Sequence, residues 1–240
     1  MRRLARIAVK AACTYTAMSL VVAIVMAEMT LHPLRLPLPS QGRIAALYKP
    51  YGAALQSVAI QAADGVELHG WYSVPERQNG QAVILFHGIG DNHGGVVGYG
   101  QVFLQKGYRI LLPDSRAHGE SGGAMATYGL LESDDIHRWV SWLYGEGAGR
   151  VDGFGESMGA ALVLESLGSE SRFCAVVAES AFSNFRSVAY DREGYFVGAG
   201  RFGMRELLEE RSASYPPSWL FSTLAGTMES ICGGPTQRMR

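Results

Sequence analysis

Short runs of apolar residues recur through the middle of this chain, and each interval between them leaves room for a helix. The four runs are Ala82–Phe86, Tyr108–Leu112, Arg150–Phe154 and Ala175–Ala178. Runs of this length without polar alternation are typical of strands that are covered on both faces. The intervals carry apolar residues at helical spacing, in Val96–Lys106 and in a segment that we expect Ser133 to cap. Alternating strands and helices predict an α/β fold with a mostly parallel sheet and right-handed crossovers.

Two more strands are predicted before the first of these runs. Val58–Gln61 and Val66–Tyr72 flank the turn signal Asp64-Gly65. The whole chain has 240 residues, of which 48% are hydrophobic, and this is enough for one domain with a core. A formal net charge of −1 predicts no electrostatic attraction to nucleic acid or to acidic lipid.

The cysteines and glycines exclude some other classes of protein. The three cysteines Cys13, Cys174 and Cys232 are odd in number and widely spaced, which argues against a disulfide framework and against a zinc site. We interpret Cys174, beside an apolar run, as a core residue. No G-x-G-x-x-G pattern follows the first strands, so a nucleotide-binding Rossmann domain is disfavoured.

The N-terminus differs in kind from the rest of the chain. Four basic residues within the first ten precede an uncharged run, Ala11–Ala27, which Glu28 ends. This length reaches the lower limit for crossing a bilayer as a helix, and the basic flank favours a single pass with the domain outside the cytoplasm. The alternative is a signal peptide that is cleaved after Ala27, which would leave a secreted or periplasmic protein. We therefore expect a membrane anchor or signal segment over 1–28, a proline-rich linker over 29–50 and one domain over 51–240.

The motif Gly155-Glu156-Ser157-Met158-Gly159 stands between a predicted strand and a predicted helix. Glycines allow a sharp turn there, and the turn lifts the Ser157 side chain above the sheet, which is the arrangement of a nucleophilic serine. The helix N-terminus also directs partial positive charge toward an oxyanion that develops beside the serine.

A second glycine turn, His87-Gly88-Ile89-Gly90, directly follows the strand that ends at Phe86. The backbone N–H groups of Ile89 and Met158 are our candidates for an oxyanion hole, while His87 is interpreted as structural. The polar loop Asp114–Ser121 is likewise interpreted as a hydrogen-bonded structural loop.

Taken together, these motifs resemble the α/β-hydrolase superfamily, in particular its bacterial branch that is similar to serine aminopeptidases and to the Bem46-type hydrolases. The resemblance covers about residues 57–195 and rests on His87-Gly88, Asp114-x-Arg116-x-His118-Gly119-x-Ser121, Gly155-x-Ser157-x-Gly159 and Glu179-Ser180-Ala181-Phe182. Ala117 departs from it, because the family usually has glycine there. The resemblance implies the α/β-hydrolase fold, a serine nucleophile, and then an acid and a histidine later in the chain.

The end of the sequence departs further from that pattern. None of the six histidines follows Ser157, and Glu229 is the one candidate acid that we find. We therefore expect a chain truncated at its C-terminus, in which the last strands of the fold and the triad histidine are missing.

These observations leave two hypotheses about function. The first is a membrane-tethered serine hydrolase of a small-molecule carboxylic ester or peptide-like amide, a chemistry that implies no metal ion and no organic cofactor. The second is an inactive hydrolase scaffold or binding protein that lacks the triad histidine. The sequence does not predict an oligomeric state.

Overall fold

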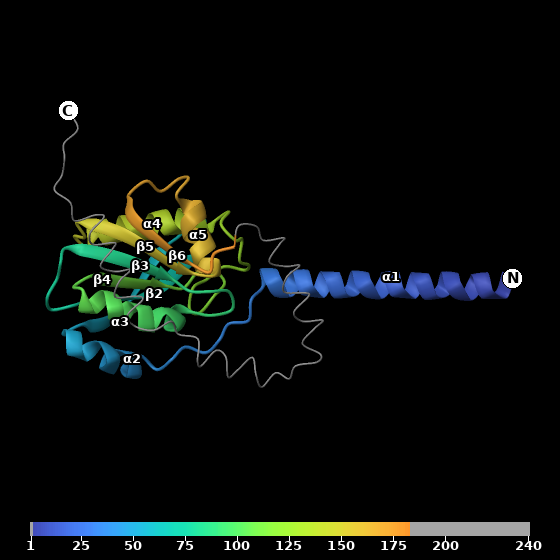
Figure 1. The fold of residues 1–240 in the computed structure, drawn as a ribbon, viewed down its shortest axis with the longest axis horizontal. Helices are drawn as coiled ribbons and strands as arrows, with labels where there is room; N and C mark the ends of the chain where they lie inside the picture. Colours follow the sequence, from blue (N-terminus) through green and yellow to red (C-terminus); the bar gives the residue numbers. More distant parts are fainter. Residues whose placement is uncertain (1, 183–240) are drawn as a thin grey trace, which may run out of the picture.

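The computed structural model of this chain describes residues 2–182. These residues form a six-stranded sheet with helices on both faces, and one long helix, α1, projects from the domain (Figure 1). The strands are β1 (Ala54–Gln61), β2 (Glu67–Val74), β3 (Gln81–Phe86), β4 (Arg109–Pro113), β5 (Arg150–Glu156) and β6 (Phe173–Glu179). The helices are α1 (Arg2–Leu31), α2 (Gln41–Tyr48), α3 (Val97–Gln105), α4 (Glu132–Gly145) and α5 (Met158–Ser166), with short 3-10 turns at Lys49–Tyr51 and His93–Val96.

The strand order is β1-β2-β4-β3-β5-β6. β1, β2 and β4 pair antiparallel, whereas β4, β3, β5 and β6 pair parallel to one another. The predicted α/β fold with a mostly parallel sheet is therefore confirmed. The chain leaves β3 toward β4 on one side, and then crosses to β5 on the other side of β3. Ligands of open α/β sheets bind at such a switch point, beyond the carboxyl ends of the strands.

Each face of the sheet carries its own hydrophobic core. Val83 and Leu85 of β3 pack with residues of α2 and α3 on one face, and Ile84 and Phe86 pack with α4 and α5 on the other. This alternation along β3 explains why its sequence is apolar throughout, since both faces of the strand are covered.

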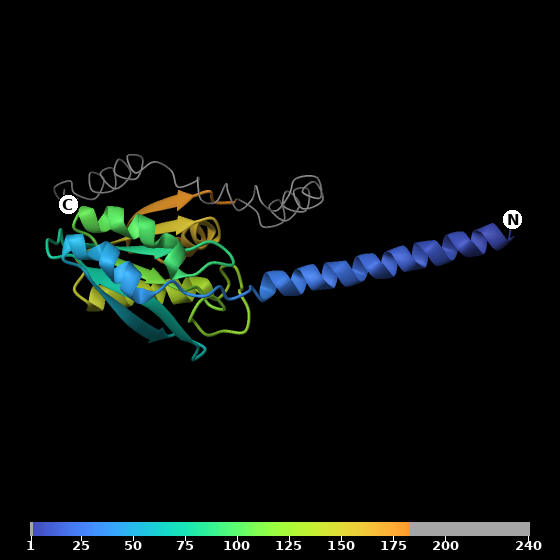
Figure 2. The same ribbon diagram turned by 90° about the horizontal axis from the view of Figure 1, so that it is seen from below.

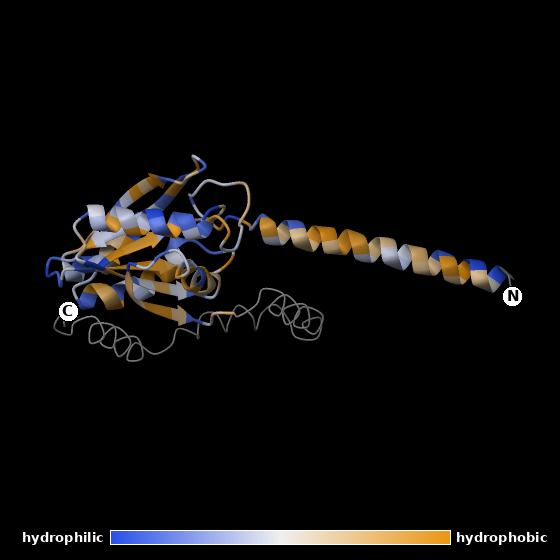
Figure 3. Cartoon of the chain, turned by 90° about the horizontal axis from the view of Figure 1, so that it is seen from above, coloured by the Kyte–Doolittle hydropathy of each residue, from blue (hydrophilic) through white to orange (hydrophobic). Residues whose placement is uncertain are grey.

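The N-terminal helix is long and apolar enough over Ala5–Leu31 to cross a membrane, and none of it is buried against the domain. Its apolar character is visible along much of its length in Figure 3. A membrane anchor and a signal sequence both fit this finding.

Part of the segment that we expected to be a linker, 29–50, is built into the domain. Residues Gln41–Tyr48 form α2, and the Ile44 and Tyr48 side chains belong to the core beside α3. The Tyr48 hydroxyl donates a hydrogen bond to the Val97 carbonyl oxygen at 3.1 Å. The prolines before residue 40 explain why the chain is extended ahead of α2, because proline disrupts helices. They do not extend into α2 itself.

Two local predictions are wrong. Ser133 lies inside α4, which begins at Glu132, and its hydroxyl donates to the Gly129 carbonyl oxygen instead of capping the helix. Cys174 is exposed on β6 and disulfide-bonded, so it is not a buried core thiol. The last strands of the fold, which we expected to be missing, would follow β6, and that part of the chain lies outside the described residues.

Candidate active site

Ser157 occupies a sharp turn between β5 and α5. Its backbone has φ 52° and ψ −110°, a left-handed conformation that a residue with a side chain seldom adopts. The Ser157 N–H donates to the carbonyl oxygen of Glu179, the last residue of β6, at 2.8 Å. The turn is therefore held by the neighbouring strand as well as by its own sequence.

The two glycines of the motif make this turn possible. A Cβ atom added to Gly155 would lie closer than 3.0 Å to the backbone of Gly159, and one added to Gly159 would lie closer than 3.0 Å to the carbonyl oxygen of Phe86. Helix α5 therefore approaches β3 more closely than any side chain would allow. The sequence predicted this sharp turn for the same reason.

We expect Gly159→Ala to destabilise the domain strongly, because the added methyl group would clash with backbone atoms that cannot move aside. An overpacked core position costs about 3 kcal/mol, which corresponds to a fall in Tm of about 6–12 °C. Thermal unfolding of the detergent-solubilised chain, followed by circular dichroism, measures this effect.

Gly145→Ala is the matched control, since a Cβ atom there would meet nothing within 4 Å. It lies at the end of α4, where alanine should stabilise the helix by about 0.5–1 kcal/mol. Equal Tm values for the two variants would contradict a close approach of α5 to β3.

The proposed oxyanion-hole residues flank the same turn. A Cβ atom added to Gly88 would lie 3.6 Å from the Ser157 Cβ, so the loop after β3 passes directly beside the serine. Within the described part of the chain, the N–H groups of Ile89 and Met158 donate no hydrogen bond. The Ser157 N–H is already paired with Glu179, so it is not available to an oxyanion, whereas the other two remain available.

Glu179 has a larger part in the site than the sequence suggested. Beyond its backbone bond to Ser157, its carboxylate Oε2 accepts a hydrogen bond from the Tyr99 hydroxyl at 2.5 Å. In the sequence, the family resemblance points to Glu179. A second indication in the sequence is that Glu179 is the first charged residue after the apolar run of β6. This position places it at the carboxyl edge of the sheet.

His87 has both ring nitrogens engaged within the domain. The Ser115 N–H donates to Nε2 at 3.1 Å, so the proton must be on Nδ1, which donates to the Gly88 carbonyl oxygen at 2.8 Å. Burial, with a smaller contribution from His118, lowers the pKa of His87 to about 4. The ring is therefore neutral at pH 7 and joins two loops, the structural role that the sequence favoured.

The other two histidines of these loops, His93 and His118, are also buried. His93 Nδ1 lies 3.0 Å from the Asp114 carboxylate, and its ring packs on Trp71 with centroids 4.0 Å apart. His118 Nδ1 lies 3.0 Å from the Arg116 carbonyl oxygen. His93 is therefore held against β2 and the loop after β4, and His118 against its own loop, and both rings are buried within the domain.

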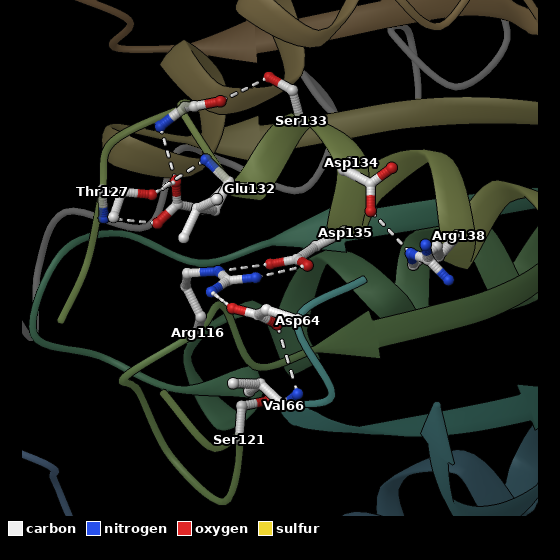
Figure 4. Close-up of polar contacts among 12 residues, drawn as sticks. Asp64, Val66, Arg116, Ser121, Thr127, Glu132, Ser133, Asp134, Asp135 and Arg138 are labelled. Atoms are coloured by element: carbon white, nitrogen blue, oxygen red, sulfur yellow. Dashed lines mark hydrogen bonds and ion pairs between the residues drawn. The ribbon is translucent and has the colours of Figure 1, made fainter. Parts of the chain in front are cut away.

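The polar loop after β4 is anchored by Arg116 (Figure 4). Its guanidinium donates to both carboxylate oxygens of Asp135 on α4, each at 2.8 Å, and to Asp64 of the β1–β2 turn at 2.9 Å. Asp114 caps the same loop by accepting from the backbone N–H groups of His93 and Glu120, both at 2.7 Å. These contacts give the loop a structural task, in agreement with the interpretation from sequence.

Glu229, the candidate acid, lies outside the described residues. Across residues 2–182, no group of three His, Cys, Asp or Glu side chains is arranged to hold a metal ion.

Comparison with known proteins places this geometry in context. A family model described as the alpha/beta hydrolase fold matches residues 81–201. Among solved structures, the esterase Pf2001 of Pyrococcus furiosus superimposes with a TM-score of 0.61 and 26% sequence identity, over 82% of this chain and 70% of that chain.

Two curated proteins are also similar in sequence. YqkD of Bacillus subtilis is 35% identical over 107 residues, which are 44% of this chain and 35% of that protein. YfhR of Escherichia coli K12 is 28% identical over 155 residues, which are 60% of this chain and 53% of that protein. The chain thus spans between about a third and a half of the length of these relatives.

Proposed function

Because this chain belongs to the alpha/beta hydrolase fold family, we propose that it is a serine hydrolase of carboxylic esters or peptide-like amides with Ser157 as its nucleophile. The observation that carries this proposal is the strained conformation of Ser157, at φ 52°, between β5 and the N-terminus of α5. Backbone strain of this kind persists only where the surrounding structure enforces it, and it occurs most often at active sites. We also propose that the chain belongs to the branch similar to serine aminopeptidases and Bem46-type hydrolases.

In this mechanism the Ser157 Oγ attacks the substrate carbonyl carbon, and its proton passes to a base. The N–H groups of Ile89 and Met158 stabilise the negative charge on the carbonyl oxygen, with support from the partial positive charge at the start of α5. The alcohol or amine then leaves with a proton, and water hydrolyses the acyl-serine. No step requires a metal ion or an organic cofactor.

A second candidate function is a hydrolase scaffold that binds a ligand without turnover. It is favoured by one specific observation, namely that no histidine occurs among the residues after Ser157 in this sequence. A serine hydroxyl is a weak nucleophile until a base takes its proton.

Covalent labelling with a fluorophosphonate tests whether Ser157 is the nucleophile. We expect the wild-type chain, supplied with imidazole as an external base, to be labelled on the peptide that contains Ser157. Ser157→Ala under the same conditions is the control. Labelling that is equal in the two proteins, or that maps to another residue, would overturn the assignment.

We further propose that α1 crosses the membrane once, with the domain outside the cytoplasm, and that it is not removed as a signal peptide. Four basic residues at its start favour this orientation. We expect the full-length protein in the membrane fraction after a high-salt wash, with its N-terminus intact by mass spectrometry. Recovery of full-length protein from the soluble cytosol, or of a chain that begins after Ala27, would contradict the proposal.

A further inference from the structure

We propose that the carboxyl edge of the sheet rests on the membrane surface, and that the substrate of Ser157 is an acyl ester of a membrane lipid. This proposal deepens the proposed function and rests on it, and it also requires α1 to lie in the membrane. Figure 2 shows β6 pointing toward the side of the domain from which α1 projects. Ser157 is hydrogen-bonded to Glu179 at the end of β6, so Ser157 and α1 are at the same end of the molecule.

The end of α1 is attached to the loop that follows β4. The Tyr128 hydroxyl donates to the Thr30 carbonyl oxygen at 2.6 Å, and the Ala126 N–H donates to the Leu31 carbonyl oxygen at 2.8 Å. These bonds use the carbonyl groups that the last turn of a helix leaves without a helical partner. Helix and domain are thus joined at a defined place.

The residues after α1 continue this attachment along the same edge. Arg35 donates to the carbonyl oxygens of Gly119 and Ser121, at 2.8 and 2.6 Å. The Asn92 side-chain amide donates to the Leu36 carbonyl oxygen at 3.3 Å. The connection between helix and domain is therefore held against the loops after β3 and β4, and it does not behave as a free tether.

The length of α1 sets the distance between these loops and the bilayer. If the uncharged run Ala11–Ala27 occupies the hydrocarbon core, the helix from Glu28 to Leu31 adds about 6 Å. The headgroup layer of one leaflet is about 5–8 Å thick. The loops bonded to Thr30 and Leu31 therefore lie at the level of the lipid headgroups.

The side chains at this edge are suited to that position. Leu130 is 80% exposed, although leucine is usually buried, and it lies in the loop that holds α1. Further apolar side chains are exposed on the loops and the linker of the same edge, namely Leu34, Leu36, Ile89, Met125 and Leu131. Together these six residues form what we call the edge patch. Such a group beside a membrane helix is expected to insert into the boundary between headgroups and acyl chains.

The edge patch also reaches the reacting serine. Ile89, one of its members, directly follows Gly88, which lies beside Ser157. The ester carbonyls of bilayer lipids lie between the headgroups and the hydrocarbon core, which is the boundary that the edge patch is expected to enter. Attack by Ser157 would form the acyl-serine bond and break the bond to the lipid alcohol. An imidazole base, supplied as a reagent in the test below, would carry the serine proton to the leaving alcohol, and water would then release the fatty acid.

The depth of the edge patch can be measured without any turnover. In the full-length chain with Cys13→Ser, Leu130→Cys is labelled with an environment-sensitive fluorophore and reconstituted into phosphatidylcholine vesicles containing doxyl-labelled lipid. Glu146→Cys is the control, because Glu146 is exposed and lies before the amino end of β5, at the opposite edge. We expect several-fold stronger quenching at position 130 than at position 146. Equal quenching at the two positions would overturn the membrane contact.

The substrate class is tested in the same vesicles with two fluorophosphonates, a long-chain lipid-like one in the bilayer and a short soluble one, with imidazole present. We expect Ser157 to react faster with the lipid-like reagent, and Leu130→Glu to lose this preference several-fold while its reaction with the soluble reagent is unchanged. No preference in the wild type would overturn the lipid substrate. Quenching at position 130 with no reaction of Ser157 toward either reagent would instead refute the proposed nucleophile and leave the membrane contact standing.

Discussion

In buffer alone, we expect the 240-residue chain to hydrolyse p-nitrophenyl butyrate at nearly the same rate as its Ser157→Ala variant. We expect this because no histidine follows Ser157 in the sequence, and the histidines of the loops after β3 and β4 are buried in the domain. In serine hydrolases that have lost a triad member, the oxyanion hole and substrate binding alone leave a residual acceleration of about 10³–10⁴ over water. Both proteins should show at most a rate of that order.

Addition of imidazole should separate the two proteins. An external base can take the Ser157 proton in the wild type, whereas Ser157→Ala has no hydroxyl to activate. The difference between their rates at each imidazole concentration removes the direct reaction of imidazole with the ester. Robust turnover without imidazole that disappears in Ser157→Ala would show the expectation to be wrong. His93→Ala and His118→Ala would then identify the histidine that supplies the base.

We expect Arg116→Met to destabilise the chain by about 3–5 kcal/mol, because it leaves a buried carboxylate without its partner. Arg116 is 4% exposed and Asp135 is 8% exposed, so water cannot replace the lost hydrogen bonds. Methionine fills a volume similar to that of the arginine side chain. The change in stability therefore reports the loss of the charge pair more than a change in packing. Denaturant unfolding of the full chain in detergent measures the change in the free energy of unfolding.

The matched control is Arg138→Met, since Arg138 pairs with Asp134 at a similar distance, 2.7 Å, on the surface of α4 (Figure 4). These two side chains are 40% and 50% exposed, and such pairs contribute only about 0.3–0.5 kcal/mol. Asp135→Leu combined with Arg116→Met should recover part of the lost stability, because neither charge of this pair remains buried. Equal effects of Arg116→Met and Arg138→Met would contradict a burial-dependent pair.

The effect of Arg116→Met should depend on pH. Burial raises the pKa of Asp135 even in the intact pair, where the hydrogen bonds from Arg116 oppose the shift, and the variant loses that opposition. The folded-state pKa of such a carboxyl group lies above its pKa in the unfolded chain. The folded state therefore loses stability as the pH rises through the folded-state pKa and the group becomes charged. The destabilisation should therefore be smaller at pH 5 than at pH 8.

The sequence alone predicted those features of the protein that depend on neighbouring residues. Apolar runs placed β3 to β6, although not their order in the sheet, and Gly155 and Gly159 marked the sharp turn at Ser157. These predictions held because a strand covered on both faces, or a turn too tight for a side chain, restricts the residues within it. The same local reasoning failed at Ser133. The residue at which a helix begins depends also on the hydrogen bonds that its first turn makes with the preceding loop.

Contacts between distant segments were decided only by the tertiary structure. Three histidines follow strand ends in the sequence, but only folding places His87 against Ser115, and His93 against Asp114 and Trp71. It also brings the Glu179 carbonyl oxygen to the Ser157 N–H, and the end of α1 to the loop after β4. Such pairings join residues tens of positions apart, so no local pattern encodes them. They are selected by the packing of the whole domain, which must find a partner for each buried polar group.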